Sequence, residues 1–224
     1  MSSQPHPTPA AGEAEPSRRR RKEARPQELL DAALDLFVEK GFAATKIDDV
    51  AARAGVSKGT VYLYFPSKEE LLKAVIRHNL SLTIARVDDL VAQFEGSTAD
   101  LMRLVAKAWW ERVGETQASG IFKLIITEVR NFPDLAKFYA EEVIEPGERL
   151  LVRLLQRGVD RGEFRATHLI DTAHSLIFPM LMLCLHKHSI GSCPSAEAIA
   201  HDPNAFIANH IDLMLHGLSA RDAG

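Results

Sequence analysis

Apolar residues recur at spacings of three and four along most of the chain, which is the period of a helix that buries one face. Between Pro26 and Lys40 this stripe consists of Leu29, Leu30, Ala33, Leu34, Phe37 and Val38. Pro26 suits the first turn of a helix, where a missing N–H costs nothing, and Gly41 is typical of the residue after a helix end. The pattern predicts a first helix over residues 26–40.

Two short helices are predicted next. Residues 45–48, Thr-Lys-Ile-Asp, have the form of a capping box and open a second helix that ends at Ala54. Gly55 marks a tight turn, and Ser57 can cap a third helix that reaches Tyr64. Two short helices joined by so tight a turn are typical of a helix-turn-helix.

The remainder of the chain also shows helical rather than alternating periodicity. Pro146 and Pro179 fall inside two of the apolar stretches and are expected to kink or split them. No internal repeat is visible, so the predicted architecture is all-α. The further predicted helices cover residues 67–94, 98–116, 120–130, 133–159, 167–188 and 203–218.

The third helix presents an unusual outward face. At about 100° per residue, Val61 and Phe65 share the inner face. A glycine permits close backbone approach, hydroxyl groups donate to phosphates or base edges, and a leucine can meet a thymine methyl group. The face is therefore suited to a DNA major groove. Its residues are Gly59, Thr60, Tyr62 and Leu63, with Lys58 and Tyr64 on the flanks.

This part of the sequence resembles the TetR family of regulators. The resemblance runs almost without a gap through residues 26–76, and its motifs are highly specific. They are the stretches GFAAT at 41–45, IDDVA at 47–51, AGVSKGTVY at 54–62 and YFPSKEEL at 64–71. The family often has two threonines where this chain has Ala44 and Thr45, which removes one possible phosphate contact.

The resemblance implies which residues meet DNA and how the protein assembles. It assigns DNA contacts to Thr45, Lys58, Thr60, Tyr62, Tyr64 and Lys68, the last three mainly on the phosphate backbone. It also implies a homodimer whose reading helices enter successive major grooves of an inverted-repeat operator, roughly 34–36 Å apart. Residues 125–135 and 162–165 look like one common type of C-terminal domain in this family, which houses an effector pocket and a dimer interface.

Charge is distributed unevenly. The formal net charge of −3 combines +4 for residues 17–80, from 13 Lys/Arg against 9 Asp/Glu, with −5 for residues 81–224 and −2 for residues 1–16. A basic run, Arg18, Arg19, Arg20 and Arg21, precedes the first predicted helix. It is either a solvated tail or an arm that contacts phosphates or a minor groove, and its position beside the motif favours DNA.

The two last predicted helices carry more apolar residues than one face needs. Residues 176–185 are apolar almost all round, and the helix at 203–218 shows the same excess. A symmetric interface between two subunits would cover both faces, although a thick core within one subunit would also do so.

Several aromatic and flexible apolar residues in the C-terminal part could line an effector pocket or belong to a plain core. A histidine one turn from Phe178 offers such a pocket a polar group. The candidate effector-binding residues are Trp109, Phe122, Ile126, His174, Phe178 and Met182.

Three other kinds of function compete with this prediction. A metal- or redox-responsive regulator would use Cys184, His188 and Cys193, of which only the first two share a helix face. An enzyme finds no support, since no nucleophile elbow, Walker loop, dinucleotide motif or Glu-x-x-His pair is present. A helical adaptor that binds only protein is the third class.

The sequence as a whole predicts a DNA-binding repressor released by a small molecule, with no cofactor or metal. Hydrophobic residues make up 46% and charged residues 25%, which is typical of a soluble globular protein. Two cysteines form no disulfide framework, so a reducing cytoplasm is expected, and no stretch reaches the roughly 20 apolar residues of a membrane span. The expected organisation is a disordered basic arm at 1–25, a helix-turn-helix domain at 26–72 and a helical effector and dimerisation domain at 73–224.

Overall fold

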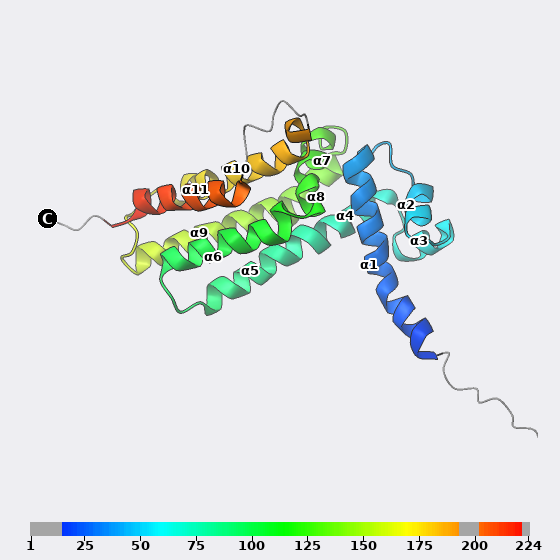
Figure 1. The fold of residues 1–224 in the computed structure, drawn as a ribbon, viewed down its shortest axis with the longest axis horizontal. Helices are drawn as coiled ribbons and strands as arrows, with labels where there is room; N and C mark the ends of the chain where they lie inside the picture. The colour runs from blue at the N-terminus through cyan, green and yellow to red at the C-terminus, as the bar shows by residue number, and fades with distance from the viewer. Residues whose placement is uncertain (1–14, 193–201, 221–224) are drawn as a thin grey trace, which may run out of the picture.

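A computed structural model describes residues 15–192 and 202–220, with side chains described over 25–191 and 202–220. The described chain is helical and forms no strand, which confirms the all-α prediction (Figure 1). The α-helices are α1 (Glu15–Lys40), α2 (Ile47–Arg53), α3 (Lys58–Tyr64), α4 (Lys68–Ile76), α5 (Leu82–Gln93), α6 (Thr98–Trp109), α7 (Gly120–Glu128), α8 (Pro133–Tyr139), α9 (Glu145–Asp160), α10 (Leu169–Lys187) and α11 (Pro203–Leu218). Short π-helical turns η1 (Arg77–Ser81), η2 (Trp110–Gly114) and η4 (Ala140–Ile144) and 3₁₀ turns η3 (Gln117–Ser119) and η5 (Ile190–Ser192) join some of them.

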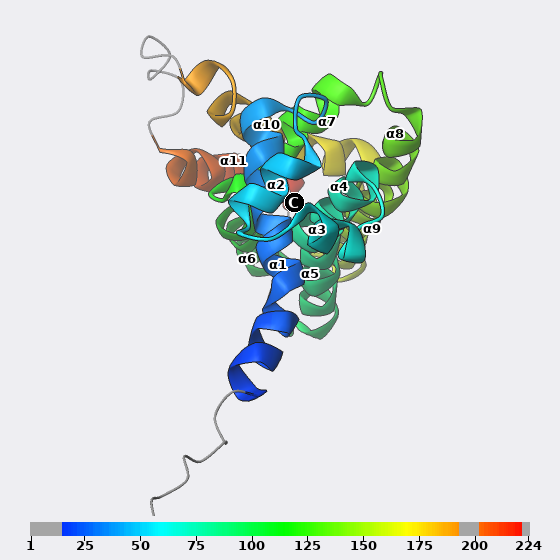
Figure 2. The ribbon, with the colours of Figure 1, turned by 90° about the vertical axis from the view of Figure 1, so that its right-hand side faces the viewer.

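The N-terminal helices form a small unit at one end of the molecule (Figures 1 and 2). Helices α2 and α4 both pack on α1, and α3 packs on α2. Leu29, Phe37, Val61 and Leu71 are at most 1% exposed at the centre of this unit. Burial of such large apolar side chains is the main force that holds three short helices in place, because helices of seven residues are not stable alone.

Helix α1 begins earlier than the sequence pattern predicts. It runs from Glu15 through Pro26, and its first turns extend away from the other helices (Figure 2). The expectation of disorder was therefore wrong for residues 15–25; residues 1–14 lie outside the described part. Arg, Lys, Glu and Ala all have high helix propensity, and Pro26 only removes one backbone hydrogen bond from a helix that is anchored by its apolar stripe further on.

The N-terminal unit and the C-terminal helices share one continuous rod. Helix α4 passes through η1 directly into α5, so the predicted domain boundary after residue 72 falls inside a helix. Apolar residues Leu72, Val75, Ile76 and Leu80 are all buried along this rod. One end of the rod therefore lies in the N-terminal unit and the other among the C-terminal helices.

The predicted break near Pro146 takes the form of a π-turn. Helices α8, η4 and α9 follow one another, with Pro146 in the first turn of α9. Pro146 has no N–H to offer the carbonyl of Glu142, four residues earlier. The Ser81 hydroxyl donates to that carbonyl over 3.1 Å, and Arg77 pairs with the Glu142 carboxylate over 3.1 Å. The two π-turns η1 and η4 are thereby tied together.

Helix α10 stays unbroken across Pro179. Among the described helices, it alone has the length and mean hydropathy, 19 residues and 1.4, of a membrane span, which the sequence pattern did not predict. Its neighbours are α7, α9 and α11, and Ala173, Leu176 and Cys184 are buried against them. Only 28% of the apolar window is buried, so part of α10 needs a further cover.

Candidate DNA-binding surface and effector cavity

The outward face of α3 lies where the helical wheel predicted. The turn before α3 uses Gly55 at a φ of +64°, and Ser57 then caps the helix by accepting the Thr60 N–H. Val61 is fully buried and fixes the rotation of the helix. As a result Tyr62 is 46% and Leu63 77% exposed, a large exposure for a leucine in a folded helix. Gly59 is exposed on the same surface.

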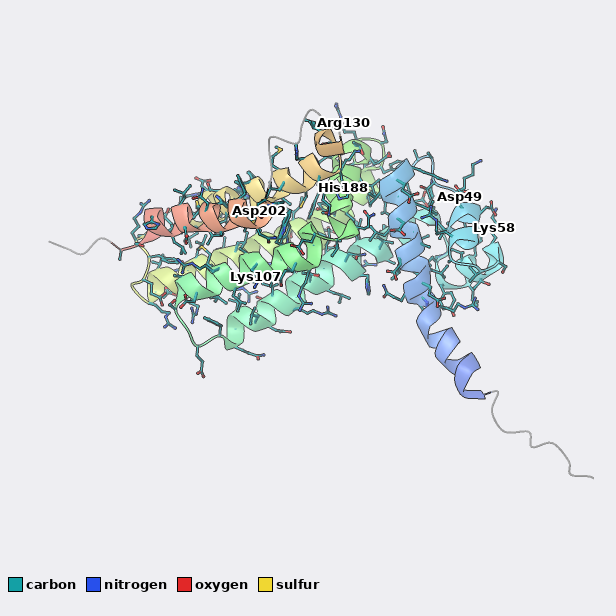
Figure 3. All side chains as sticks on the ribbon, viewed as in Figure 1. Asp49, Lys58, Lys107, Arg130, His188 and Asp202 are labelled. Atoms are coloured by element: carbon teal, nitrogen blue, oxygen red, sulfur yellow. The ribbon has the colours of Figure 1, made fainter. Side chains whose placement is uncertain are left out.

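Polar groups beside this face are held by neighbouring residues. The Lys58 ammonium donates to the Asp48 carboxylate over 2.8 Å, which joins α3 to α2, and this hydrogen bond raises the pKa of Lys58. Lys58 lies at the outer end of the N-terminal unit, where Figure 3 labels it near Asp49. The Thr60 hydroxyl is 2.9 Å from the Ser57 hydroxyl, and Tyr64 is half-buried. Lys58 and Thr60 thus each have a polar partner within the N-terminal unit.

Thr45 was predicted to contact DNA, but the structure places it in the interior. Its side chain is 1% exposed, and its hydroxyl donates to the carbonyls of Leu36 and Gly41 over 3.1 and 2.7 Å. The expected capping box is also wrong, because Lys46 occupies the N-cap of α2 and its side chain makes no cap hydrogen bond. The hydroxyl of Thr45 instead ties the end of α1 to the start of α2.

Lys68 also differs from its predicted role as a phosphate contact. Its ammonium donates to the carbonyls of Phe42, Ala43 and Thr45 over 2.8, 3.2 and 3.0 Å. It also lies 4.5 Å from the centre of the Phe42 ring. An ammonium has three protons, and all three are used within the protein. Lys68 therefore stabilises the α1–α2 connection through these three hydrogen bonds.

Lys46 is a cation that the sequence reasoning missed. It is exposed at the start of α2 and forms no ion pair with any described residue. It stands between two of the family-like stretches, residues 41–45 and 47–51, which was the available signal.

A cavity of about 490 Å³ opens among the C-terminal helices. Its walls come from α5 to α10, with one residue of α11, and are almost entirely apolar. The structure brings five predicted effector residues to this cavity: Trp109, Phe122, Ile126, His174 and Phe178. Met182 does not line it and is 62% exposed, because it points away from the side of α10 on which Leu181 and Leu185 face the cavity.

Polar groups in the cavity wall are few. Nε2 of His174 lies 2.9 Å from Oε2 of Glu148, and the His174 ring stacks on Phe178 with 5.0 Å between centroids. Tyr139 also lines the cavity and was not predicted, since it reads as an ordinary core aromatic in the sequence. Burial raises the pKa of Tyr139, so its hydroxyl stays protonated.

The cysteine alternative loses support in the described residues. Cys184 is fully buried, and burial raises the pKa of its thiol to about 12, which disfavours the reactive thiolate. Nε2 of His188 lies 2.8 Å from the Ser119 hydroxyl, and no cluster of three metal-binding side chains occurs in this part of the chain. Cys193 lies outside the described residues.

Comparison with known proteins decides the family. Residues 29–75 match the model for bacterial regulatory proteins of the tetR family, and residues 95–190 match the tetracyclin repressor-like C-terminal domain. A regulator from Bacillus subtilis, YfiR, is 31% identical over 153 residues, covering 67% of this chain and 73% of that protein. The chain belongs to the TetR family of transcriptional regulators.

Other relatives and solved structures share the whole architecture. The repressor KstR2 of Rhodococcus jostii is 26% identical and aligns with 89% of this TetR-family chain and 93% of its own. FadR of Bacillus subtilis in complex with stearoyl-CoA has a TM-score of 0.66 at 18% identity, covering 85% and 98% of the two chains. The ketosteroid regulator KstR2 of Mycobacterium tuberculosis has a TM-score of 0.65 at 21% identity, covering 88% and 96%. At these identities the two structures show the fold alone.

Proposed function

We propose that this TetR-family regulator represses transcription by binding an inverted-repeat operator as a homodimer, and that an apolar small molecule in the cavity releases it. The observation that carries the proposal is the α4–η1–α5 rod. The rod packs on α1 at its DNA-side end, while Leu80, Thr83, Ile84 and Val87 line the cavity further along it.

A ligand in the cavity acts on this rod from the side. Helix α5 packs against α9, and η1 packs against η4, so a ligand that separates these elements tilts the rod. Because α4 and α3 belong to one packed unit, the reading helix moves with it. A dimer that must place two reading helices in successive grooves, roughly 34–36 Å apart, is sensitive to a small tilt in each subunit.

The uncovered apolar surface of α10 and α11 supports the homodimer. These helices lie side by side (Figure 1). Phe178 and Met182 on α10 and Leu213 on α11 are each more than half exposed. A second copy laid across the same two helices would remove them from water and also explains the outward apolar part of α10.

The nature of the cavity supports an apolar effector. Its described lining includes no lysine or arginine, and its volume fits the range for ligand pockets. One structurally similar regulator was solved in complex with stearoyl-CoA, and another is described as a ketosteroid transcriptional regulator. By analogy we assign the effector of this protein to the broad class of lipid-like molecules.

The test measures whether a probe that fills the cavity changes the affinity for operator. An operator is first selected from random duplexes, and its affinity is then measured by fluorescence anisotropy with and without decanol as an apolar probe. We expect decanol to weaken operator binding, and operator to weaken decanol binding by the same factor, since linkage is reciprocal.

Gly147→Leu serves as the cavity-blocked variant. Gly147 lines the cavity, and a Cβ at this position meets only Ile84, at an ordinary 3.8 Å, so a larger side chain can enter the cavity. This variant should bind operator but ignore decanol. Equal responses of the variant and the native protein to decanol would refute control through the cavity.

A further inference from the structure

The Tyr139 hydroxyl is a polar group that has no hydrogen-bond partner among the described residues. Its side chain is 8% exposed, yet the hydroxyl makes no hydrogen bond to any described residue. Every fully enclosed side-chain oxygen or nitrogen in the described residues has a partner. The Tyr139 hydroxyl therefore borders open space, and the space that Tyr139 lines is the cavity. A buried phenol normally finds a partner, so a ligand group is the natural one.

A second polar group lies further along the same wall, at a more open part of the cavity, since the Glu148 side chain is 35% exposed. Oε2 of Glu148 meets His174, while Oε1 has no hydrogen bond to any described residue. Glu148 follows Tyr139 by nine positions in the nearly continuous run from α8 to α9, which corresponds to about 13 Å along a helix axis.

On the facing helix α10, His174 contacts Glu148 directly. The cavity thus has one polar group towards each end and apolar walls between them.

Resting on the proposed function, we infer that the effector is an elongated, uncharged and largely apolar molecule with a hydrogen-bonding group at each end, one bound by Tyr139 and the other by Glu148. The phenol donates to an acceptor at one end of the ligand. The free Glu148 oxygen accepts from a hydroxyl or amide at the other end. A carboxylate is disfavoured there, because it would meet Glu148 with no lysine or arginine in the described lining to offset the repulsion.

Three probes that share the same ten-carbon chain distinguish these ends. They are decanediol, which has a hydroxyl at both ends, decanol and decanoate. An extended decane chain spans a distance of the required order. We expect the full-length protein to bind the diol about three- to tenfold more tightly than decanol in calorimetry, the usual gain from one extra hydrogen bond, although the diol is less apolar. Decanoate should bind least tightly.

Two variants assign the ends. Tyr139→Phe should weaken diol binding about three- to tenfold and change decanol binding less, since decanol can use Glu148 instead. The same variant should unfold at an equal or higher temperature without ligand, because it removes a buried hydroxyl that has no partner. A merely structural hydroxyl would instead lower stability when removed. Glu148→Met should weaken diol binding to a similar degree.

Thr83→Val is the matched control. Thr83 also lines the cavity, but its hydroxyl is already bonded to the Asn79 carbonyl over 2.9 Å. This variant should lose stability and keep the ratio of diol to decanol affinity.

Equal binding of diol and decanol, tightest binding of decanoate, no binding of any probe, or an unchanged diol affinity in Tyr139→Phe would each overturn the two-ended ligand. The operator assay keeps the two proposals apart. If decanol releases operator but the diol shows no preference, the proposed function stands and this inference fails. If the diol binds as expected without releasing operator, the ligand inference stands and control through the cavity fails.

Discussion

At the scale of single residues, the structure separates two lysines that look alike in the sequence. Lys58 is exposed and paired with one aspartate, whereas Lys68 donates to three backbone carbonyls. Lys68→Met should lower the free energy of unfolding by about 1–3 kcal/mol, because carbonyls of the α1–α2 connection lose their donor. Urea titration followed by circular dichroism measures this loss.

Lys58→Met is the control, and it should affect operator binding rather than stability. It should leave stability nearly unchanged and flatten the dependence of operator affinity on salt by about 0.9 per phosphate contact, counted twice in a dimer. If Lys68→Met flattened the salt dependence without loss of stability, the role assigned to Lys68 would be wrong.

The cysteines give a second prediction at this scale. Burial holds the pKa of Cys184 at about 12, so its thiol stays protonated and unreactive over the whole physiological range. In the Cys193→Ser variant, a disulfide reagent such as dithionitrobenzoate should modify no thiol near neutral pH until the protein is unfolded. Rapid modification of the folded variant, with loss of operator binding, would restore the redox alternative.

At the scale of elements, the extended α1 changes the physical form of the basic arm. The backbone of the Arg18–Arg21 run is helical and projects from the N-terminal unit. Replacing all four with alanine keeps the helix, since alanine has the highest helix propensity. We predict that affinity for operator and for random duplex falls to a similar extent, because phosphate contacts carry no sequence information.

Anisotropy titrations against both duplexes at several salt concentrations measure this effect. The contrasting variant is Leu63→Ala on the exposed face of α3, which should shift base preference at one position per half-site. A selective loss of operator affinity in the arginine variant would show that the arm reads sequence, which contradicts the prediction.

At the scale of the whole molecule, dimerisation should depend on the outward face of α10 and α11. Aspartate at Met182 or Leu213 places a charge on an apolar surface that the monomer leaves exposed. Each variant should therefore fold, sediment as a monomer and lose tight operator binding, because paired half-sites require paired reading helices. Leu82→Asp, at an exposed leucine of α5, should remain a dimer. Dimers in both α10 and α11 variants would place the interface elsewhere.

Not every apolar residue of these two helices belongs to this surface. Leu181 on α10 and Ile211 on α11 both line the cavity, and Ile211 is 3% exposed. Charges there would damage the core of the subunit. An excess of apolar residues on a helix predicts that more than one side is covered, but it does not say which side meets which neighbour.

The sequence by itself determined the helices and the reading face. Caps such as Ser57, the left-handed turn at Gly55 and the inward rotation set by Val61 act within one or two turns, so they can be deduced from neighbours in the chain. The family motifs assigned the same segment to DNA binding. Residue type, meaning aromatic and flexible apolar side chains with a histidine one turn from Phe178, likewise predicted five of the residues that line the cavity.

Only the tertiary structure decided what the polar side chains of those helices do. Thr45 and Lys68 belong to a DNA-binding motif, yet their partners are carbonyls at the α1–α2 connection, up to 26 residues away. Tyr139 resembles a core aromatic until the helices around it leave a cavity beside its hydroxyl. A hydrogen-bonding group acquires its role from the atoms within about 3 Å, and where the chain crosses itself those atoms are set by helix packing rather than by adjacent sequence.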